Sequence, residues 1–336
     1  MKAAVFRGAG KPLSIETVDD PTPGANDLII KIQRCGICGT DLHMTEGHSW
    51  SYAVGLVPGH EYAGEVVEVG SQVQGYKIGD RITALPSTGC GQCEACAYGN
   101  FVLCRNAPGV VGGFAEYLRV PTQVAIKLPN TFSAADGALV EPFAVGLYGV
   151  RLAAMKAGDR VLVQGAGSVA LATIFWAKRL GAGKIVVVSR STRRAEMARA
   201  MGADAFIQSG ADEVKEVAEA LGGSPNIVFE CVGAAGLLPL AIQHASVLGH
   251  VVSLGFCTAP DTIVPAFAAY KGVRLSFPVG YTLKDFEYVA DEMLAGHADP
   301  KMLISSVVTL DELPTVFESL RAPNNETKVH LSLIGN

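Results

Sequence analysis

The residues best suited to chemistry lie between Cys35 and Glu61. This stretch opens with Cys-Gly-Ile-Cys-Gly-Thr-Asp-Leu-His over residues 35–43 and closes with Pro-Gly-His-Glu over residues 58–61. A thiolate, an imidazole and a carboxylate are the ligands of a catalytic zinc ion, which keeps a fourth position for water or substrate. A metal-bound oxygen is useful only if a nearby group exchanges electrons or protons with it. We expect the rest of the chain to supply that group.

A second group of thiols indicates a structural metal. Cys90, Cys93, Cys96 and Cys104 fall within fifteen residues, and four such thiolates can fill every position around one tetrahedral zinc ion. The alternative is that these cysteines form two local disulfides or are four thiols without a ligand role. Neither arrangement suits a reducing compartment. We therefore expect a closed structural zinc site.

A glycine-rich turn predicts the electron-transfer partner. Gly165, Gly167 and Ala170 fit the dinucleotide fingerprint, with Ser168 and Val169 inside it. The turn follows an expected strand at 160–164 and opens an expected helix that runs to about residue 180. This context makes the glycine motif specific, because its backbone can approach a pyrophosphate and the helix N-terminus favours the charge. We expect a dinucleotide coenzyme.

The end of the next strand, at 184–188, indicates which coenzyme. An Asp or Glu there usually holds the ribose 2′-hydroxyl of NAD, but this chain has Ser189 and Arg190, with Arg193 and Arg194 one turn on. Arg190 can pair with a 2′-phosphate, so NADP(H) is favoured. A solvated basic start of a helix is the alternative interpretation.

Composition limits the class of protein. At 336 residues with 49% hydrophobic and 18% charged residues, the chain should fold into roughly two domains. The net charge of −5 gives no basic field for nucleic acid or an anionic membrane. No apolar run reaches about 18 residues, and the start lacks the pattern of a signal peptide. With eight cysteines, a cytoplasmic enzyme with reduced thiols is expected.

The order of expected elements predicts an α/β fold in three segments. Residues 1–145 carry short strands such as 28–32 and 64–69, which suggest a small β-barrel with metal motifs on its loops. Residues 146–280 alternate strands and helices, as in a doubly wound parallel sheet. Residues 281–336 leave this pattern, with helices near 284–294 and 310–320 and a strand at 328–333, and should return to the first domain.

Together these motifs resemble the zinc-dependent medium-chain alcohol dehydrogenases, the family of sorbitol and threonine dehydrogenases. The resemblance rests on residues 36–43, Gly59-His60-Glu61, the four cysteines, Gly79-Asp80-Arg81 and the glycine-rich turn. It implies a GroES-like catalytic domain, a Rossmann coenzyme domain, a cleft between them, and a homodimer or homotetramer. The partner would be a small-molecule alcohol or ketone.

The resemblance also implies a ligand set. Cys38 and His60 would bind the catalytic zinc, with Glu61 as a ligand or close partner. The chain lacks the second cysteine of the liver-type enzymes and has Glu141 there, as in the polyol-dehydrogenase branch. Whether Glu61 or Glu141 binds directly is left open, and so is a purely electrostatic role for Glu141 at a helix N-terminus.

The mechanism implied by the family is hydride transfer between an alcohol carbon and the nicotinamide, with zinc acidifying the hydroxyl. Thr40 would contact the substrate oxygen and pass its proton, through the nicotinamide ribose, to His43, while Asp41 would orient a zinc-bound histidine. Ordinary capping and surface roles are the alternatives for Thr40 and His43.

Rival functions are an NAD-linked polyol dehydrogenase, a zinc-free quinone or enoyl reductase, and a non-catalytic NADPH sensor. The sequence leaves the substrate open and suggests only a pocket near Trp50, Tyr52, Phe143 and Phe256. We expect His48 at the cleft mouth and packing roles for Cys35, Cys231 and Cys257. His244, His250 and His297 should be surface or capping residues.

Overall fold

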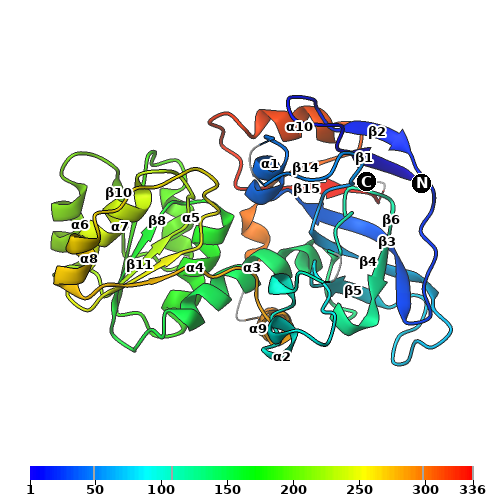
Figure 1. The fold of residues 1–336 in the computed structure, drawn as a ribbon, viewed down its shortest axis with the longest axis horizontal. Helices are drawn as coiled ribbons and strands as arrows, with labels where there is room; N and C mark the ends of the chain where they lie inside the picture. The colour runs from blue at the N-terminus through cyan, green and yellow to red at the C-terminus, as the bar shows by residue number, and fades with distance from the viewer. Residues whose placement is uncertain (48–49, 107–108, 297–298, 335–336) are drawn as a thin grey trace. The chain divides into compact units, whose positions relative to one another are not determined.

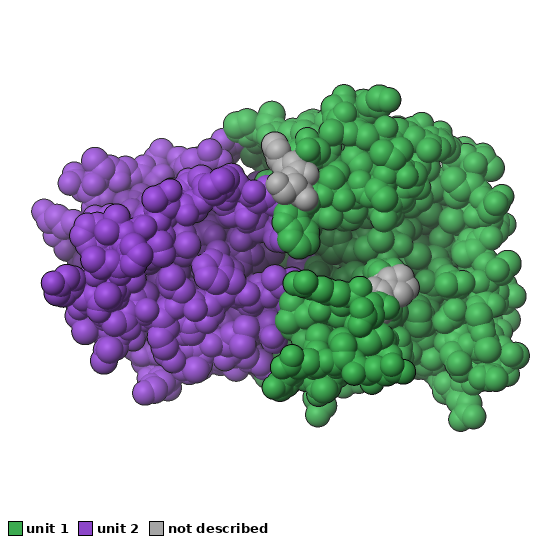
Figure 2. Space-filling model, in the orientation of Figure 1, with its two compact units in different colours: residues 1–141, 280–336 green, residues 142–279 purple. Residues whose placement is uncertain are grey.

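The computed structural model describes residues 1–47, 50–106, 109–296 and 299–334. Two compact units make up the chain, Met1–Glu141 with Gly280–Asn336 and, between them, Pro142–Val279 (Figure 2). The sequence placed the boundaries at 145/146 and 280/281. The first boundary has no sequence signal because it falls inside one continuous helix, α3 (Ala134–Leu152).

The first unit is built on antiparallel strands. Its larger sheet has the order β14-β15-β3-β4-β5-β7, with β6 also paired to β3, and β1 pairs with β2 in a separate ribbon. The strands are β1 (Lys2–Val5), β2 (Ser14–Thr17), β3 (Asp27–Gly36), β4 (Glu61–Val69), β5 (Arg81–Ala84), β6 (Tyr117–Pro121), β7 (Ala125–Lys127), β14 (Ile304–Val308) and β15 (Lys328–Ser332). β3 buries its aliphatic residues Leu28, Ile29, Ile30 and Ile32, whereas Lys31 among them is exposed.

The C-terminal segment completes this sheet. β15 runs antiparallel to β3, with His330 opposite Gly36 and Leu331 opposite Cys35, and Figure 1 shows the red strand beside the blue one. Residues almost 300 positions apart therefore lie together at the end of β3. The helices of this unit are α1 (Gly39–Met44), α2 (Glu94–Ala97), α9 (Leu283–Leu294) and α10 (Leu313–Ser319), with short 3₁₀ turns η1 (Phe101–Leu103), η2 (Thr122–Val124) and η3 (Pro300–Leu303).

The second unit is a parallel sheet with the order β10-β9-β8-β11-β12-β13. Its strands are β8 (Arg160–Gln164), β9 (Lys184–Ser189), β10 (Ala205–Gln208), β11 (Ile227–Glu230), β12 (His250–Ser253) and β13 (Arg274–Ser276). Its helices are α4 (Ser168–Arg179), α5 (Ala195–Ala200), α6 (Glu213–Leu221), α7 (Leu237–His244) and α8 (Pro265–Lys271). Continuous apolar runs such as Val161–Val163 are buried because helices cover both faces of a parallel sheet. None of the helices in the described part of the chain is long and apolar enough to span a membrane.

Candidate active site and coenzyme pocket

Strand register brings together the two ends of the Cys35–Glu61 stretch. Gly36 lies opposite Glu61 in the antiparallel pair of β3 and β4, and Cys38 follows as the N-cap residue of α1. Glycine at position 36 leaves room for Glu61, because a Cβ there would lie 2.0 Å from its carboxylate oxygen and would displace it. The side chains of Cys38, His60 and Glu61 therefore converge at one edge of the sheet.

The convergent atoms suit a metal ion. One potential ligand atom from each of Cys38, His60 and Glu61 lies within 4.8 Å of the others. His60 and Glu61 are buried, so a cation here would be largely shielded from water. A thiolate, an imidazole nitrogen and a carboxylate form a donor set that fits zinc and leaves room for a further ligand.

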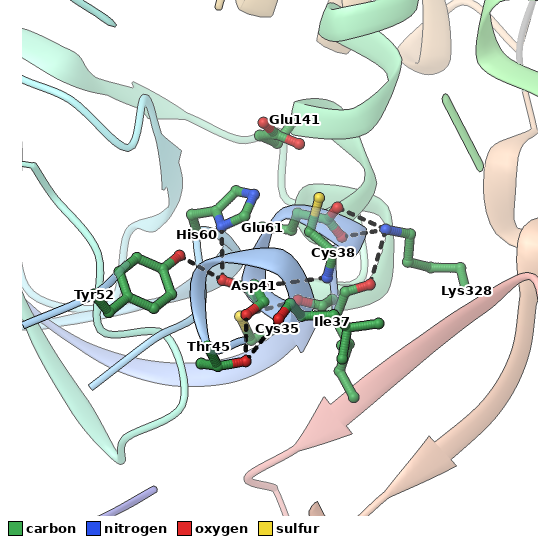
Figure 3. Close-up of polar contacts among 12 residues, drawn as sticks. Cys35, Ile37, Cys38, Asp41, Thr45, Tyr52, His60, Glu61, Glu141 and Lys328 are labelled. Carbon is green, nitrogen blue, oxygen red and sulfur yellow. Dashed lines mark hydrogen bonds and ion pairs between the residues drawn. The ribbon is translucent and has the colours of Figure 1, made fainter. Parts of the chain in front are cut away.

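Asp41 sets the orientation of His60. Its fully buried carboxylate lies 3.1 Å from His60 Nδ1, accepts a hydrogen bond from Tyr52 at 2.8 Å, and accepts another from the Cys38 amide at 3.2 Å. A proton on Nδ1 leaves the Nε2 lone pair free for a metal, and Figure 3 shows that nitrogen pointing away from Asp41. Asp41 thus holds the tautomer that a metal ligand requires.

The contact between Asp41 and His60 shifts the pKa of both side chains. Burial alone would lower the pKa of His60, but the charges of Asp41 and Cys38 outweigh it and raise the pKa well above the usual range. Burial would raise the pKa of Asp41, yet His60 and the surrounding hydrogen bonds lower it. Positive charge next to Asp41 and Cys38 is therefore favoured.

Lys328 is a member of the site that the sequence did not reveal. Its ammonium donates to both carboxylate oxygens of Glu61, at 2.6 and 2.7 Å, and to the Ile37 carbonyl at 3.2 Å. Both side chains are 1% exposed. Burial would lower the pKa of Lys328, but the Glu61 charge raises it. Glu61 is thus neutralised by a buried cation from β15.

Glu141 lies near the cluster, on the side of Cys38 and His60 away from Asp41 (Figure 3). It is in the interior of α3, before Pro142, so the helix N-terminal role considered from the sequence is wrong. Burial, the main cause, raises the pKa of Glu141 to about 7. Tyr281, which the sequence also did not indicate, donates a hydrogen bond to it at 2.5 Å. Glu141 lies outside the group of three closest ligand atoms.

The two proposed proton-transfer residues lie on the short helix α1. Thr40 and His43 are both half-buried, and Nδ1 of His43 lies 3.4 Å from the carboxylate of Glu46. Because they follow Cys38 by two and five residues, α1 fixes their positions relative to the ligand cluster.

The four-cysteine group is assembled as its spacing predicts. The sulfur of Cys93 lies 3.5 Å from that of Cys96 and 3.7 Å from that of Cys104. The sulfurs of Cys90 and Cys96 are 4.0 Å apart. Four thiolates about 2.3 Å from a tetrahedral zinc would be about 3.8 Å apart. A backbone hydrogen bond from Gln92 lowers the pKa of Cys90 to about 6, and one from Cys90 lowers that of Cys104. All eight cysteines are described, and all are free thiols.

The glycine-rich turn borders a pocket of about 600 Å³ in the second unit. Gly165 has φ +102°, and a Cβ at Gly167 would meet no atom within 4 Å, so a ligand can approach the backbone there. Ser168 and Val169 begin α4. Ser189, Arg190 and Arg194 line the same pocket. The turn, Arg190 and Arg194 therefore share one cavity.

Comparisons with known proteins agree with this architecture. The model of the alcohol dehydrogenase GroES-like domain matches residues 24–130, and that of the zinc-binding dehydrogenase domain matches residues 168–295. An L-threonine 3-dehydrogenase of Pseudoalteromonas atlantica is 30% identical over 329 residues, which cover 95% of this chain and 96% of that protein. The chain belongs to the zinc-dependent medium-chain alcohol dehydrogenases.

Solved members of this alcohol dehydrogenase family share the whole fold. A zinc-binding dehydrogenase from Sinorhizobium meliloti, bound to NADP, is 34% identical with a TM-score of 0.91, and 98% of each chain is covered. The 2R,3R-butanediol dehydrogenase of Bacillus subtilis is 31% identical with a TM-score of 0.87, and 99% of each chain is covered. The predicted family, the GroES-like domain and the Rossmann sheet are confirmed.

Several residues outside the alcohol dehydrogenase motifs lie elsewhere than the sequence suggested. Phe143 is in α3 and packs in the core of the second unit against Trp176, so it is not the loop residue that the sequence suggested. His244 and His250 are buried, not superficial, and Cys257 is exposed in a loop. Cys35 is buried at the end of β3 as expected. His48 and His297 lie outside the described residues.

Proposed function

We propose that this alcohol dehydrogenase transfers hydride between an alcohol, preferentially a secondary one, and NADP(H), with one catalytic and one structural zinc. The observation that carries the proposal is the convergence of Cys38, His60 and Glu61 around one point, with His60 oriented by Asp41. A cluster that only stabilised the fold through ion pairs would not need a cysteine and a histidine whose side chains converge on the same position. The family membership supports the same interpretation.

The residues divide the work at the catalytic site. Cys38 and His60 would hold the metal through Sγ and Nε2, and Glu61 and Glu141 would supply the carboxylates of the set. Zinc would polarise the alcohol or carbonyl oxygen, and the nicotinamide would accept or deliver the hydride. Thr40 would hydrogen-bond the substrate oxygen, and His43 would take up the proton at the far end of α1. Cys90, Cys93, Cys96 and Cys104 would hold the structural ion.

The preference for NADP(H) rests on the charge at the end of β9. Ser189, Arg190 and Arg194 line the pocket at the point where an acidic residue would hold the 2′-hydroxyl of NAD. Arginine can pair with a 2′-phosphate through two parallel hydrogen bonds. The Sinorhizobium relative was solved with NADP, which supports this choice.

The preference for a secondary alcohol comes from the relatives. A threonine 3-dehydrogenase and a 2,3-butanediol dehydrogenase are named for oxidising secondary hydroxyl groups. An NAD-linked polyol dehydrogenase is the second candidate, favoured by Glu141 at a position where liver-type enzymes have cysteine. A cytoplasmic homodimer or homotetramer is the expected form, with small molecules as the other partners.

The direct experiment is a panel of secondary alcohols, polyols, primary alcohols and ketones assayed with NADP(H) and NAD(H). The proposal expects turnover of secondary alcohols with a preference for NADP(H). Turnover of polyols with NAD alone would favour the second candidate. Absence of any dinucleotide-linked turnover by zinc-loaded protein would favour a non-catalytic NADPH-binding protein.

A further inference from the structure

A buried carboxylate and a buried imidazole form a pair that the proposed reaction does not use. Glu213 begins α6 and His244 ends α7, and Oε1 of Glu213 lies 3.1 Å from Nε2 of His244. The His244 side chain is fully buried and that of Glu213 is 7% exposed. The sequence analysis expected His244 to be a surface or capping residue, so this pair was not predicted.

The pair has one consistent proton arrangement. Burial is the main cause that lowers the pKa of His244, so its ring is neutral and carries one proton. Among the described residues, Nδ1 of His244 has no hydrogen-bond partner, whereas Nε2 faces a carboxylate. The proton therefore lies on Nε2 and is donated to Glu213. One oxygen of Glu213 is held in place, and the other can accept a hydrogen bond.

Glu213 also lines the coenzyme pocket. It shares that pocket with the glycine-rich turn, Arg190 and Ser209. Leu237 and Leu240 of α7 provide apolar wall there, and His244 follows Leu240 by one helical turn, on the same face of the helix. His244 thus supports Glu213 from behind the apolar wall.

The strand order shows which part of a dinucleotide Glu213 would meet. The glycine-rich turn follows β8, Ser189 and Arg190 follow β9, and Ser209 and Glu213 follow β10. These strands are adjacent in the order β10-β9-β8. A dinucleotide that places its pyrophosphate on the turn and its ribose beside β9 carries its base onward, toward β10. Apolar walls suit a flat base.

The charge of Glu213 selects the group it can bind. A carboxylate repels phosphate and only accepts hydrogen bonds, and the exocyclic amine is the hydrogen-bond donor of adenine. We propose that Glu213 accepts a hydrogen bond from the adenine amino group of the coenzyme, and that His244 is the residue that positions its carboxylate. The proposal rests on the proposed binding of a nicotinamide dinucleotide and adds the recognition of its base.

The test compares equilibrium binding of NADP⁺ with that of its hypoxanthine analogue, in which a carbonyl oxygen replaces the amine and the neighbouring ring nitrogen N1 carries a hydrogen. Binding is followed by titration calorimetry on the folded full-length protein. The wild type should bind NADP⁺ about tenfold or more tightly than the analogue, the range for a hydrogen bond to a charged group. Glu213→Ala should bring the ratio near one.

Glu213→Gln gives a sharper, nearly isosteric test. His244 would still donate to the amide oxygen, which turns the amide nitrogen, a donor, toward the base. This variant should therefore prefer the hypoxanthine analogue, whose carbonyl accepts. His244→Leu should reduce the wild-type ratio, and His244→Gln, which can still donate, should restore part of it. Glu216→Gln, an exposed position one turn along α6, is the charge-matched control.

An unchanged ratio in both Glu213 variants would overturn the proposal. So would a change confined to the preference between NADP⁺ and NAD⁺, because it would place the carboxylate at the ribose. Failure of the wild type to bind any dinucleotide would instead contradict the proposed function itself, so the two failures are distinguishable.

Discussion

The ammonium of Lys328 lies 2.6 and 2.7 Å from the two carboxylate oxygens of Glu61, although the two residues are 267 positions apart. Because both are almost completely buried, neither charge can be solvated by water. The C-terminal strand β15 is therefore joined to the metal-ligand cluster by electrostatics as well as by backbone hydrogen bonds.

Removal of one partner of the Lys328–Glu61 pair should destabilise the folded protein. Lys328→Met leaves a buried, uncompensated carboxylate, which destabilises a protein by about 3–5 kcal/mol, and adding Glu61→Gln should recover much of that loss. Urea denaturation of the metal-free protein measures both. The control is Lys127→Met, which breaks a more exposed pair with Asp80 and should cost less than about 1 kcal/mol. Equal losses at the two lysines would contradict this account.

Asp41→Asn should weaken metal binding. Without the carboxylate, Nδ1 of His60 loses its charged partner, and losses of about 10–100-fold in metal affinity are typical for such residues. Competition with a chromophoric chelator gives the affinity. Asp20→Asn, at an exposed carboxylate, should leave it unchanged. Wild-type affinity in the Asp41 variant would mean that the hydrogen bond does not orient the ligand.

Arg190→Asp should move coenzyme preference toward NAD. The substitution removes a cation and introduces a charge that repels a 2′-phosphate, so the ratio of affinities should shift by about 10–100-fold. Arg193→Asp, outside the described lining of the pocket, is the matched control. The same shift at both positions would indicate that the overall charge of this region sets the preference, and not a direct contact between Arg190 and the 2′-phosphate.

His330 should make the protein sensitive to acid. Its side chain is buried in β15, both ring nitrogens lack hydrogen-bond partners among the described residues, and burial lowers its pKa to about 3. The unfolded chain binds the proton first, so stability is retained above about pH 6.5 and lost as the pH falls toward 3. From pH 6.5 to 4.5, the wild type should lose about 2–3 kcal/mol more than His330→Leu. Parallel losses in urea denaturation would contradict this.

The sequence was most informative where chemistry depends on neighbours along the chain. Cys90, Cys93 and Cys96 are close because a short loop and α2 bring them together, and the turn at Gly165–Gly167 is a local βα connection. Cys38, Asp41 and His43 are likewise fixed by a single short helix. Such spacing constrains geometry almost irrespective of the rest of the fold.

The sequence was least informative where a contact depends on tertiary packing. Lys328 and Tyr281 lie far along the chain from Glu61 and Glu141, and no local pattern marks a buried lysine or tyrosine as the partner of a given acid. His244 was expected to be a surface or capping residue because it falls outside every motif, yet packing of α7 beside α6 buries it against Glu213. Phe143 was assigned to a pocket because the continuity of α3 was not recognised.

In the proposed function, a metal held by Cys38 and His60 is essential for turnover, and zinc content measured together with dinucleotide-linked alcohol oxidation tests this most directly. Ligand counting predicts about two zinc ions per wild-type chain and about one in Cys38→Ala. That variant should keep its fold and its binding of NADP⁺ but lose turnover. A Cys38→Ala protein with two zinc ions and wild-type turnover would contradict the account.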